Sequence, residues 1–110
     1  MAVWRTKAYS LFGLKPGAYS GADGKRYLFR DLVEQSRTAI REEDEDLLHR
    51  IVTYVTWAAE QNSDELTSSV DLAFFKQLFD DAELCAQLRR YFPEPLFNEK
   101  WTLLKNPSYD

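Results

Sequence analysis

Residues 25–92 contain neither glycine nor proline, so no residue in this stretch forces the backbone out of a helical path. Apolar side chains within it recur three and four residues apart, as Leu28, Phe29 and Leu32 do near its start. This spacing is typical of amphipathic helices, which bury one face against a core. It predicts an all-α fold with helices over residues 25–41, 45–61, 63–79 and 80–92.

Two further helices are expected outside this stretch. A short helix over residues 1–12 is indicated by an apolar face that carries Trp4, Ala8, Leu11 and Phe12. Pro93 ends the long stretch, and Pro95 can open a last helix at its first position. The apolar face of that helix carries Phe97, Trp101 and Leu104. We expect five or six helices in an irregular orthogonal bundle, with an α-solenoid-like stack as the alternative.

The glycines define the organisation of the chain, because all four lie between Gly13 and Gly24. Such a cluster is typical of a loop. A length of 110 residues suits one hydrophobic core. We therefore predict a single domain over residues 1–110, with a short N-terminal helix (1–12), a glycine-rich loop (13–24), a helical core (25–105) and a tail (106–110).

Acidic and polar residues stand where several helices are expected to begin. The run Glu42–Asp46 precedes the second helix of the long stretch. Asn62 with Glu65, and Asp80 with Glu83, have the spacing of capping boxes. Side-chain oxygens at such positions accept hydrogen bonds from free backbone N–H groups, and carboxylates there face the positive end of the helix dipole.

The composition excludes several classes of function. The net charge is −4, and the acidic excess lies after residue 40, which disfavours generic nucleic-acid binding because that binding depends on neutralising phosphates. A single Cys and a single His exclude an internal disulfide and a zinc or His-rich metal site. No apolar run is long enough for a membrane span, and the N-terminus lacks the apolar segment of a signal peptide. We expect a cytoplasmic protein without cofactor or metal.

No catalytic constellation is evident. The glycine-rich loop departs from the phosphate-binding Walker pattern, since Gly24 and Lys25 are followed by arginine. Asp46 and His49 resemble half of a di-iron site, but a second histidine is lacking. We interpret Cys85 as a buried structural thiol on an apolar helix face. Asp71 lies among apolar residues, so we expect it to pair structurally, with an arginine for example, rather than to do chemistry.

The helix expected over residues 63–79 is apolar on two faces. One face carries Leu66, Val70, Ala73 and Phe74. The second face, roughly opposite at helical spacing, carries Leu72, Phe75 and Phe79. Monomers rarely leave such a patch in water, so either another helix covers it or a second copy of the chain does. The second face therefore predicts a homodimer interface if no other helix of the chain packs on it.

Three segments carry a resemblance to a known family. They are residues 46–60 (DLLHRIVTYVTWAAE), 70–81 (VDLAFFKQLFDD) and 91–97 (YFPEPLF). Over residues 27–107 the chain resembles a family of small uncharacterised bacterial helical domains, classed as a domain of unknown function. Family members often carry an acidic residue after the paired aromatics, where this chain has Lys76. The resemblance implies an all-helical fold in a bacterial protein, and the family offers no catalytic residues to transfer.

The remaining features favour a non-enzymatic protein-binding module. We expect an immunity- or antitoxin-type protein, one encoded on a mobile gene cassette for example, whose acidic surface masks a basic partner. Trp57 is the aromatic candidate for that interface, because tryptophan is enriched at protein contacts. The predicted partner-binding residues are Glu42, Glu43, Asp44, Glu45, Asp46, Trp57, Asp80 and Asp81. The alternative is a small apolar ligand held between helices, in a pocket lined by Tyr54, Phe74 and Tyr91.

Overall fold

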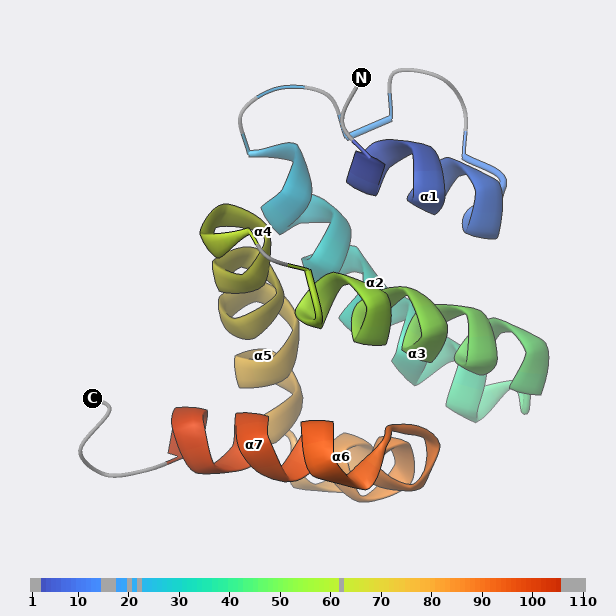
Figure 1. Ribbon diagram of the computed structural model, residues 1–110. Helices are drawn as coiled ribbons and strands as arrows, with labels where there is room; N and C mark the ends of the chain where they lie inside the picture. Colours follow the sequence, from blue (N-terminus) through green and yellow to red (C-terminus); the bar gives the residue numbers. More distant parts are fainter. Residues whose placement is uncertain (1–2, 15–17, 20, 22, 62, 106–110) are drawn as a thin grey trace.

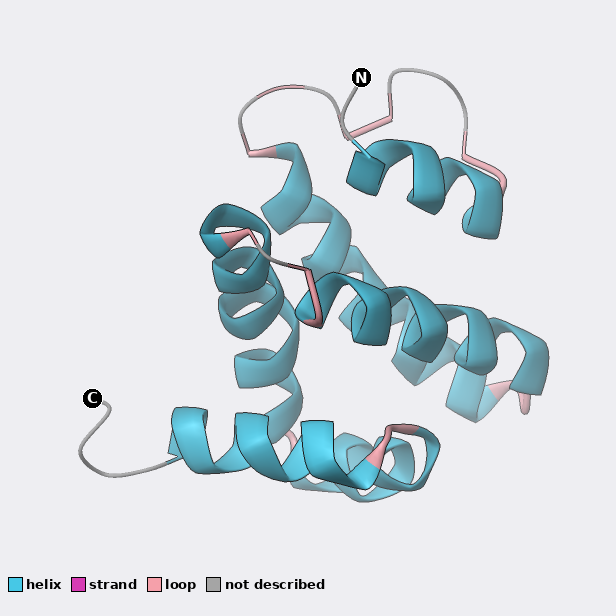
Figure 2. Cartoon of the chain, viewed as in Figure 1, coloured by secondary structure: helices cyan, strands magenta, loops and turns pink. Residues whose placement is uncertain are grey.

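Helices make up most of the chain in a computed structural model, which describes residues 3–14, 18–19, 21, 23–61 and 63–105. Within these ranges there is no β-strand (Figure 2), so the predicted all-α class is confirmed. Residues 1–2 of the expected first helix, parts of the glycine-rich loop, Asn62 and the expected tail over 106–110 lie outside the described residues.

The helix bounds follow the predicted ones closely. The helices α4, η1 and α5 run on without a break, so the described chain has six helical segments, within the range predicted. A π-helical stretch, η1, forms the middle of this long helix. The elements are α1 (Val3–Phe12), α2 (Gly24–Arg41), α3 (Glu45–Ala59), α4 (Asp64–Ser69), η1 (Val70–Phe75), α5 (Lys76–Phe79), α6 (Ala82–Leu88), the 3-10 helix η2 (Arg89–Tyr91) and α7 (Glu94–Lys105).

The helices cross one another instead of stacking in one direction. The continuous α4–η1–α5 helix stands across α3 and α7, and α1 lies beside α3 (Figure 1). Helix α2 packs against both α3 and η1, while α7 packs against η1 and α5. The arrangement is the irregular bundle that the sequence predicts, and not the solenoid-like stack.

Helix α3 is the central helix, as the width of its apolar face indicates. Ile51, Tyr54, Val55 and Ala58 are fully buried, and α3 contacts α1, α2, α4 and η1. The Tyr54 hydroxyl donates a hydrogen bond of 2.9 Å to the Trp4 carbonyl, so the buried phenol satisfies its polar atom and ties α1 to α3. Burial raises the pKa of the Tyr54 phenol above its ordinary value.

The π-helical stretch changes the phase of the long helix. Lys76 N–H donates to the Asp71 carbonyl, five residues back, where an α-helix would use the residue four back. Because a π-turn holds more residues than an α-turn, successive side chains rotate less about the axis. The face that carries Phe75 and Phe79 therefore swings toward the face of Leu66 and Val70. The straight helical periodicity placed these two faces roughly opposite each other.

The helix caps form at the expected junctions, in two cases one residue later than predicted. Asp44 accepts a hydrogen bond from Leu47 N–H at 3.1 Å and caps α3. Ser63, not Asn62, caps α4, and Asp81, not Asp80, caps α6. In both corrected cases the residue after the predicted one has the extended backbone that lets its side chain reach the N–H three positions on.

Among the three glycines that the structure describes, Gly24 is the one where a side chain has no room. A β-carbon there would lie 1.8 Å from the Tyr19 carbonyl oxygen and 3.3 Å from the Trp4 indole. The loop therefore approaches the first turn of α2 more closely than any other residue type allows. Arg5 holds this approach, because its guanidinium donates to the carbonyls of Tyr19 and Gly21.

We predict that Gly24→Ala lowers the free energy of unfolding by about 1–3 kcal/mol, the usual cost of forcing extra atoms into a packed site. Chemical denaturation followed by circular dichroism measures the change. Gly13→Asn is the matched control, since Gly13 has open space around it and asparagine tolerates its left-handed backbone (φ +62). Equal stability of wild type and Gly24→Ala would contradict the close approach.

Candidate functional site

An open groove runs between α6 and α7, and it carries exposed aromatic and basic side chains together. Two overlapping hollows of about 370 and 430 Å³ make it up. Both hollows include Ala86, Arg89, Phe97 and Asn98, so they are continuous. The two helices form this surface because α6 runs into η2, which ends at Tyr91 before Pro93, and the chain turns back into α7 (Figure 1).

Aromatic side chains form one end of the groove. Phe79 and Phe97 are buried and lie edge to face with ring centroids 5.4 Å apart. Trp101 packs on Phe79 at 5.1 Å, yet 44 % of its surface is exposed. Ala82 and Ala86 on α6 are small, so they leave the space in front of these rings open. The groove thus presents a rigid apolar surface with one large aromatic side chain at its mouth.

Two arginines give the groove a basic rim. The Arg89 guanidinium lies over the Phe97 ring, 5.5 Å from its centroid, and the Arg90 guanidinium lies 5.3 Å from the centroid of Tyr91. Within the described part of the chain, neither arginine forms an ion pair. Glu94 is the acidic residue that lines the groove beside them. Stacking on an aromatic ring orients a guanidinium and leaves the N–H groups at its edge available to a carboxylate.

A buried ion pair holds α7, which forms one side of the groove, against η1. Lys100 Nζ lies 2.8 Å from Asp71 Oδ1, and both residues are buried between α7 and η1. This oxygen accepts no other hydrogen bond from the described residues. The predicted structural pairing of Asp71 is confirmed, with a lysine in place of an arginine. Because Lys100 precedes Trp101 in α7, the ion pair sets the rotation of α7 about its axis and so the direction of Trp101.

The sequence interpretation did not single out the groove residues. Phe97, Trp101 and Leu104 share helical spacing and were expected on one buried face, but only Phe97 and Leu104 are buried. The buried stripe of α7 in fact runs through Phe97, Lys100 and Leu104. The one available signal was an aromatic pair on α7 that follows two adjacent arginines, Arg89 and Arg90, and that signal is weak without knowledge of the fold.

Several of the acidic residues that were predicted to bind a partner make hydrogen bonds or ion pairs within the chain. Asp44 caps α3, Asp46 pairs with Arg50 at 2.8 Å, and the Tyr91 hydroxyl donates to the Glu45 carboxylate at 2.8 Å. Glu42, Glu43 and Asp80 are exposed. The set therefore does not form one free acidic face, although its members remain near solvent.

Asp81 has a structural role at the start of α6. Its carboxylate accepts from Leu84 N–H at 3.0 Å and pairs with Arg37 at 3.1 Å, and Arg37 also pairs with Glu34. The hydrogen bond from Leu84 N–H, followed by the contact with Arg37, lowers the pKa of Asp81 below its ordinary value. Asp81 therefore links the start of α6 to the last turns of α2. This contact positions α6, which forms the other side of the groove.

The second apolar face of the α4–η1–α5 helix is largely covered within the chain. Phe75 is fully buried against Phe92, with ring centroids 5.5 Å apart, and Phe79 is covered by Phe97 and Trp101 of α7. Only Leu72 of the predicted self-association stripe is exposed, at 50 %. The interpretation of Leu72, Phe75 and Phe79 as a free dimer surface is therefore wrong, because the π-turn and α7 bring the two phenylalanines into the core.

The predicted ligand pocket is filled by side chains. Tyr54 and Phe74 are fully buried, Tyr54 against Phe12 and Phe29, and Phe74 against Phe75 and Phe92. Tyr91 is partly exposed and holds Glu45. Tyr54, Phe74 and Tyr91 therefore line no common cavity, since the space between α3, η1 and η2 is used for packing.

Trp57 is partly buried on α3. It stacks on Tyr54 at 5.8 Å, and Lys7 of α1 lies 5.2 Å from its ring centroid. Its contacts with α1 make Trp57 part of the helix packing, which leaves Trp101 as the more exposed tryptophan of the two.

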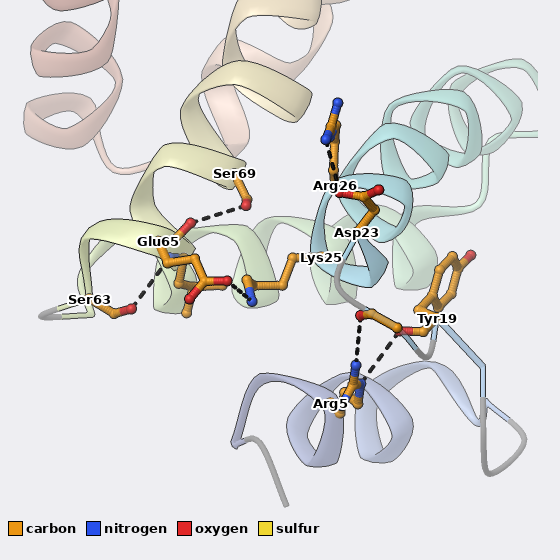
Figure 3. A network of polar contacts seen from close by, with 10 residues as sticks. Arg5, Tyr19, Asp23, Lys25, Arg26, Ser63, Glu65 and Ser69 are labelled. Carbon is orange, nitrogen blue, oxygen red and sulfur yellow. Dashed lines mark hydrogen bonds and ion pairs between the residues drawn. The ribbon is translucent and has the colours of Figure 1, made fainter.

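The basic side chains of the N-terminal third are also engaged internally (Figure 3). Lys25 pairs with Glu65 at 2.8 Å and lies 5.5 Å from the centroid of the Trp4 ring. Arg26 pairs with Asp23 at 3.0 Å, and Arg5 points at the backbone of the glycine-rich loop. These contacts join α1, α2 and α4, and they engage Arg5, Lys25 and Arg26 within the chain.

The groups considered for chemistry stay apart. His49 is exposed and packs edge to face on Tyr91, with centroids 5.5 Å apart. Cys85 is only partly buried, and it lines the α6–α7 groove, so its expected place in the core is corrected. Among the described residues, no three His, Cys, Asp or Glu side chains gather where they could hold a metal ion. None of the described helices is long and apolar enough to cross a membrane.

These features define an all-helical bundle with a surface groove between α6 and α7. The chain belongs to the family described as domain of unknown function DUF7674, whose model matches residues 16–103. The match spans the core helices from α2 onward and nearly all of α7, so the groove lies within the family domain. No curated protein and no solved structure matches the chain.

Proposed function

We propose that the domain is a non-enzymatic protein-binding module that engages its partner through the α6–α7 groove. The single observation that carries the proposal is Trp101, which is 44 % exposed at the mouth of a groove whose apolar surface is fixed by buried rings. Tryptophan and arginine dominate the binding energy of protein interfaces, and they act best beside well-packed apolar surface.

The same proposal covers the role of the protein in the cell. We place the domain in the cytoplasm of a bacterium, where an immunity- or antitoxin-type protein would block a partner by covering its surface. A partner contact through the predicted acidic residues has less support than one through the groove. Asp44, Asp46 and Asp81 already make capping hydrogen bonds or ion pairs within the chain. A second copy of the chain is a less favoured partner now that Phe75 and Phe79 are buried.

A small apolar ligand is the second candidate, and the volume of the groove favours it. A hollow of about 370 Å³ falls within the range of small-molecule sites, roughly 300–1,000 Å³. Such sites enclose most of the ligand surface, however, whereas this groove is open to solvent along the space between the two helices. An extended or helical segment of a protein fits that shape better.

Selection of peptides on the folded domain tests the proposal. A phage-displayed library of random peptides is panned on the wild type, and selected peptides are synthesised with a fluorescent label for anisotropy titrations. We expect Trp101→Ala to weaken binding by about 30-fold, which corresponds to the roughly 2 kcal/mol of an interface hot spot. Leu72→Ala removes an equally exposed apolar side chain outside the groove and should leave the affinity unchanged.

A second variant guards against an effect on folding, because Trp101 also packs on Phe79. Ala86→Gln places a longer polar side chain in the groove from an exposed helix position and removes no core contact. It should weaken the same peptides at least tenfold while its circular dichroism and melting temperature match those of the wild type. Peptides that bind both variants as well as wild type would contradict the proposal.

A further inference from the structure

We infer that the occupant of the α6–α7 groove is an acidic protein segment with a bulky apolar side chain next to its carboxylates. This inference rests on the proposed function and adds the chemistry of the partner. It runs against the overall charge of the chain, which at −4 would by itself favour a basic partner. The charge of the partner segment depends on the charges that line the groove and not on the net charge of the chain, because screening limits the reach of surface charges to about 8–10 Å.

Arg89 is the first candidate to bind a carboxylate of the partner. Its guanidinium lies 5.5 Å from the centroid of the Phe97 ring, at the part of the groove that the two hollows share. In the described part of the chain no carboxylate pairs with it. A guanidinium placed in this way offers parallel N–H donors, and the group that matches them with two hydrogen bonds is a carboxylate.

Arg90 extends the basic rim along the same edge. It stacks on Tyr91 with 5.3 Å from guanidinium to ring centroid, and it also lacks an ion pair among the described residues. Glu94 is the one acidic side chain that lines the groove with these arginines, so the lining is net basic. Asn98 adds an uncharged polar group at the centre of the groove, opposite Ala86. The rim can therefore satisfy more than one carboxylate of a partner.

The aromatic end of the groove supplies an apolar surface for a side chain of the partner. Trp101 and Phe79 line only the hollow that lacks Glu94, whereas Phe97 lines both hollows. A partner whose apolar side chain lies against Trp101 could place a neighbouring carboxylate at Arg89. The apolar contact would supply affinity, and the charges would set the orientation and the rate of association.

The peptide library distinguishes the charge of the occupant from the existence of the groove interaction. We expect peptides selected on the wild type to be enriched in Asp and Glu close to an aromatic or large aliphatic residue. Arg89→Glu should weaken the synthetic acidic peptides at least tenfold. Arg30→Glu is the matched control, since Arg30 is also exposed and stacked on an aromatic ring, that of Tyr27 at 5.8 Å, but on α2 and outside the groove.

Different results would contradict the acidic occupant, the protein-binding groove, or both. Selected peptides that depend on Trp101 but are neutral or basic, or that ignore Arg89→Glu, overturn the acidic occupant and leave the protein-binding groove in place. An absence of peptides that depend on Trp101 or Ala86 overturns both proposals. A labelled single-stranded oligothymidylate that binds more tightly than the peptides and loses binding in Arg89→Glu would replace the acidic protein segment with a nucleic acid.

Discussion

Lys100→Met is expected to lower the free energy of unfolding by about 3–5 kcal/mol, the usual cost of leaving one charge of a buried ion pair without its partner. The Lys100 ammonium is the ionic contact of the Asp71 carboxylate between α7 and η1, and both groups are buried. Without it, a carboxylate would stay in an apolar environment or the helices would separate to let water in. Urea denaturation followed by far-UV circular dichroism measures the loss.

Two controls make this prediction specific. The double variant Asp71→Leu, Lys100→Met replaces both charges with apolar side chains, and leucine has the branched shape of aspartate, so most of the stability should return. Arg50→Met breaks the exposed Asp46–Arg50 pair, which has the same 2.8 Å contact, and should cost no more than about 1 kcal/mol. A double variant as unstable as Lys100→Met would show that the charges are not the cause.

The second large effect is expected from Phe75→Ala, with a loss of about 3–5 kcal/mol. Phe75 is fully buried, and its ring lies 5.5–5.8 Å from the rings of Phe74, Phe79 and Phe92. Truncation leaves a cavity at the point where η1, α5 and the end of η2 meet. Leu72→Ala, three residues earlier and half exposed, should change stability by roughly 0.5 kcal/mol or less.

Phe75→Glu tests the corrected place of this residue. We expect the variant to be unfolded by circular dichroism, because a carboxylate would be forced into the aromatic cluster. Light scattering of the wild type and the variant at matched concentration completes the experiment. A folded, monomeric Phe75→Glu obtained from a dimeric wild type would restore the dimer interface and contradict the buried position.

The candidate site could be predicted only in part. The sequence indicated that Asp71 would pair structurally and that no catalytic set exists in the pattern, and the pairing was found with Lys100. It did not predict which of the aromatic side chains would face solvent, since Phe97 and Trp101 occupy equivalent positions on a helical wheel. Their difference arises from the packing of α7 on η1 and α5, where burial of Lys100 against Asp71 turns Phe97 inward and leaves Trp101 partly exposed.

Local sequence features suffice to predict the all-helical class and most helix bounds. Residues 25–92 lack helix breakers, Pro93 ends a helix, and capping residues stand close to each start, so local backbone preferences alone fix these features. Packing between helices instead sets the change of phase at the π-turn, the burial of Phe75 and Lys100, and the groove with Trp101 at its mouth. These depend on contacts between helices far apart in the chain, where a π-turn or a buried charge is stable only because a particular neighbour packs against it.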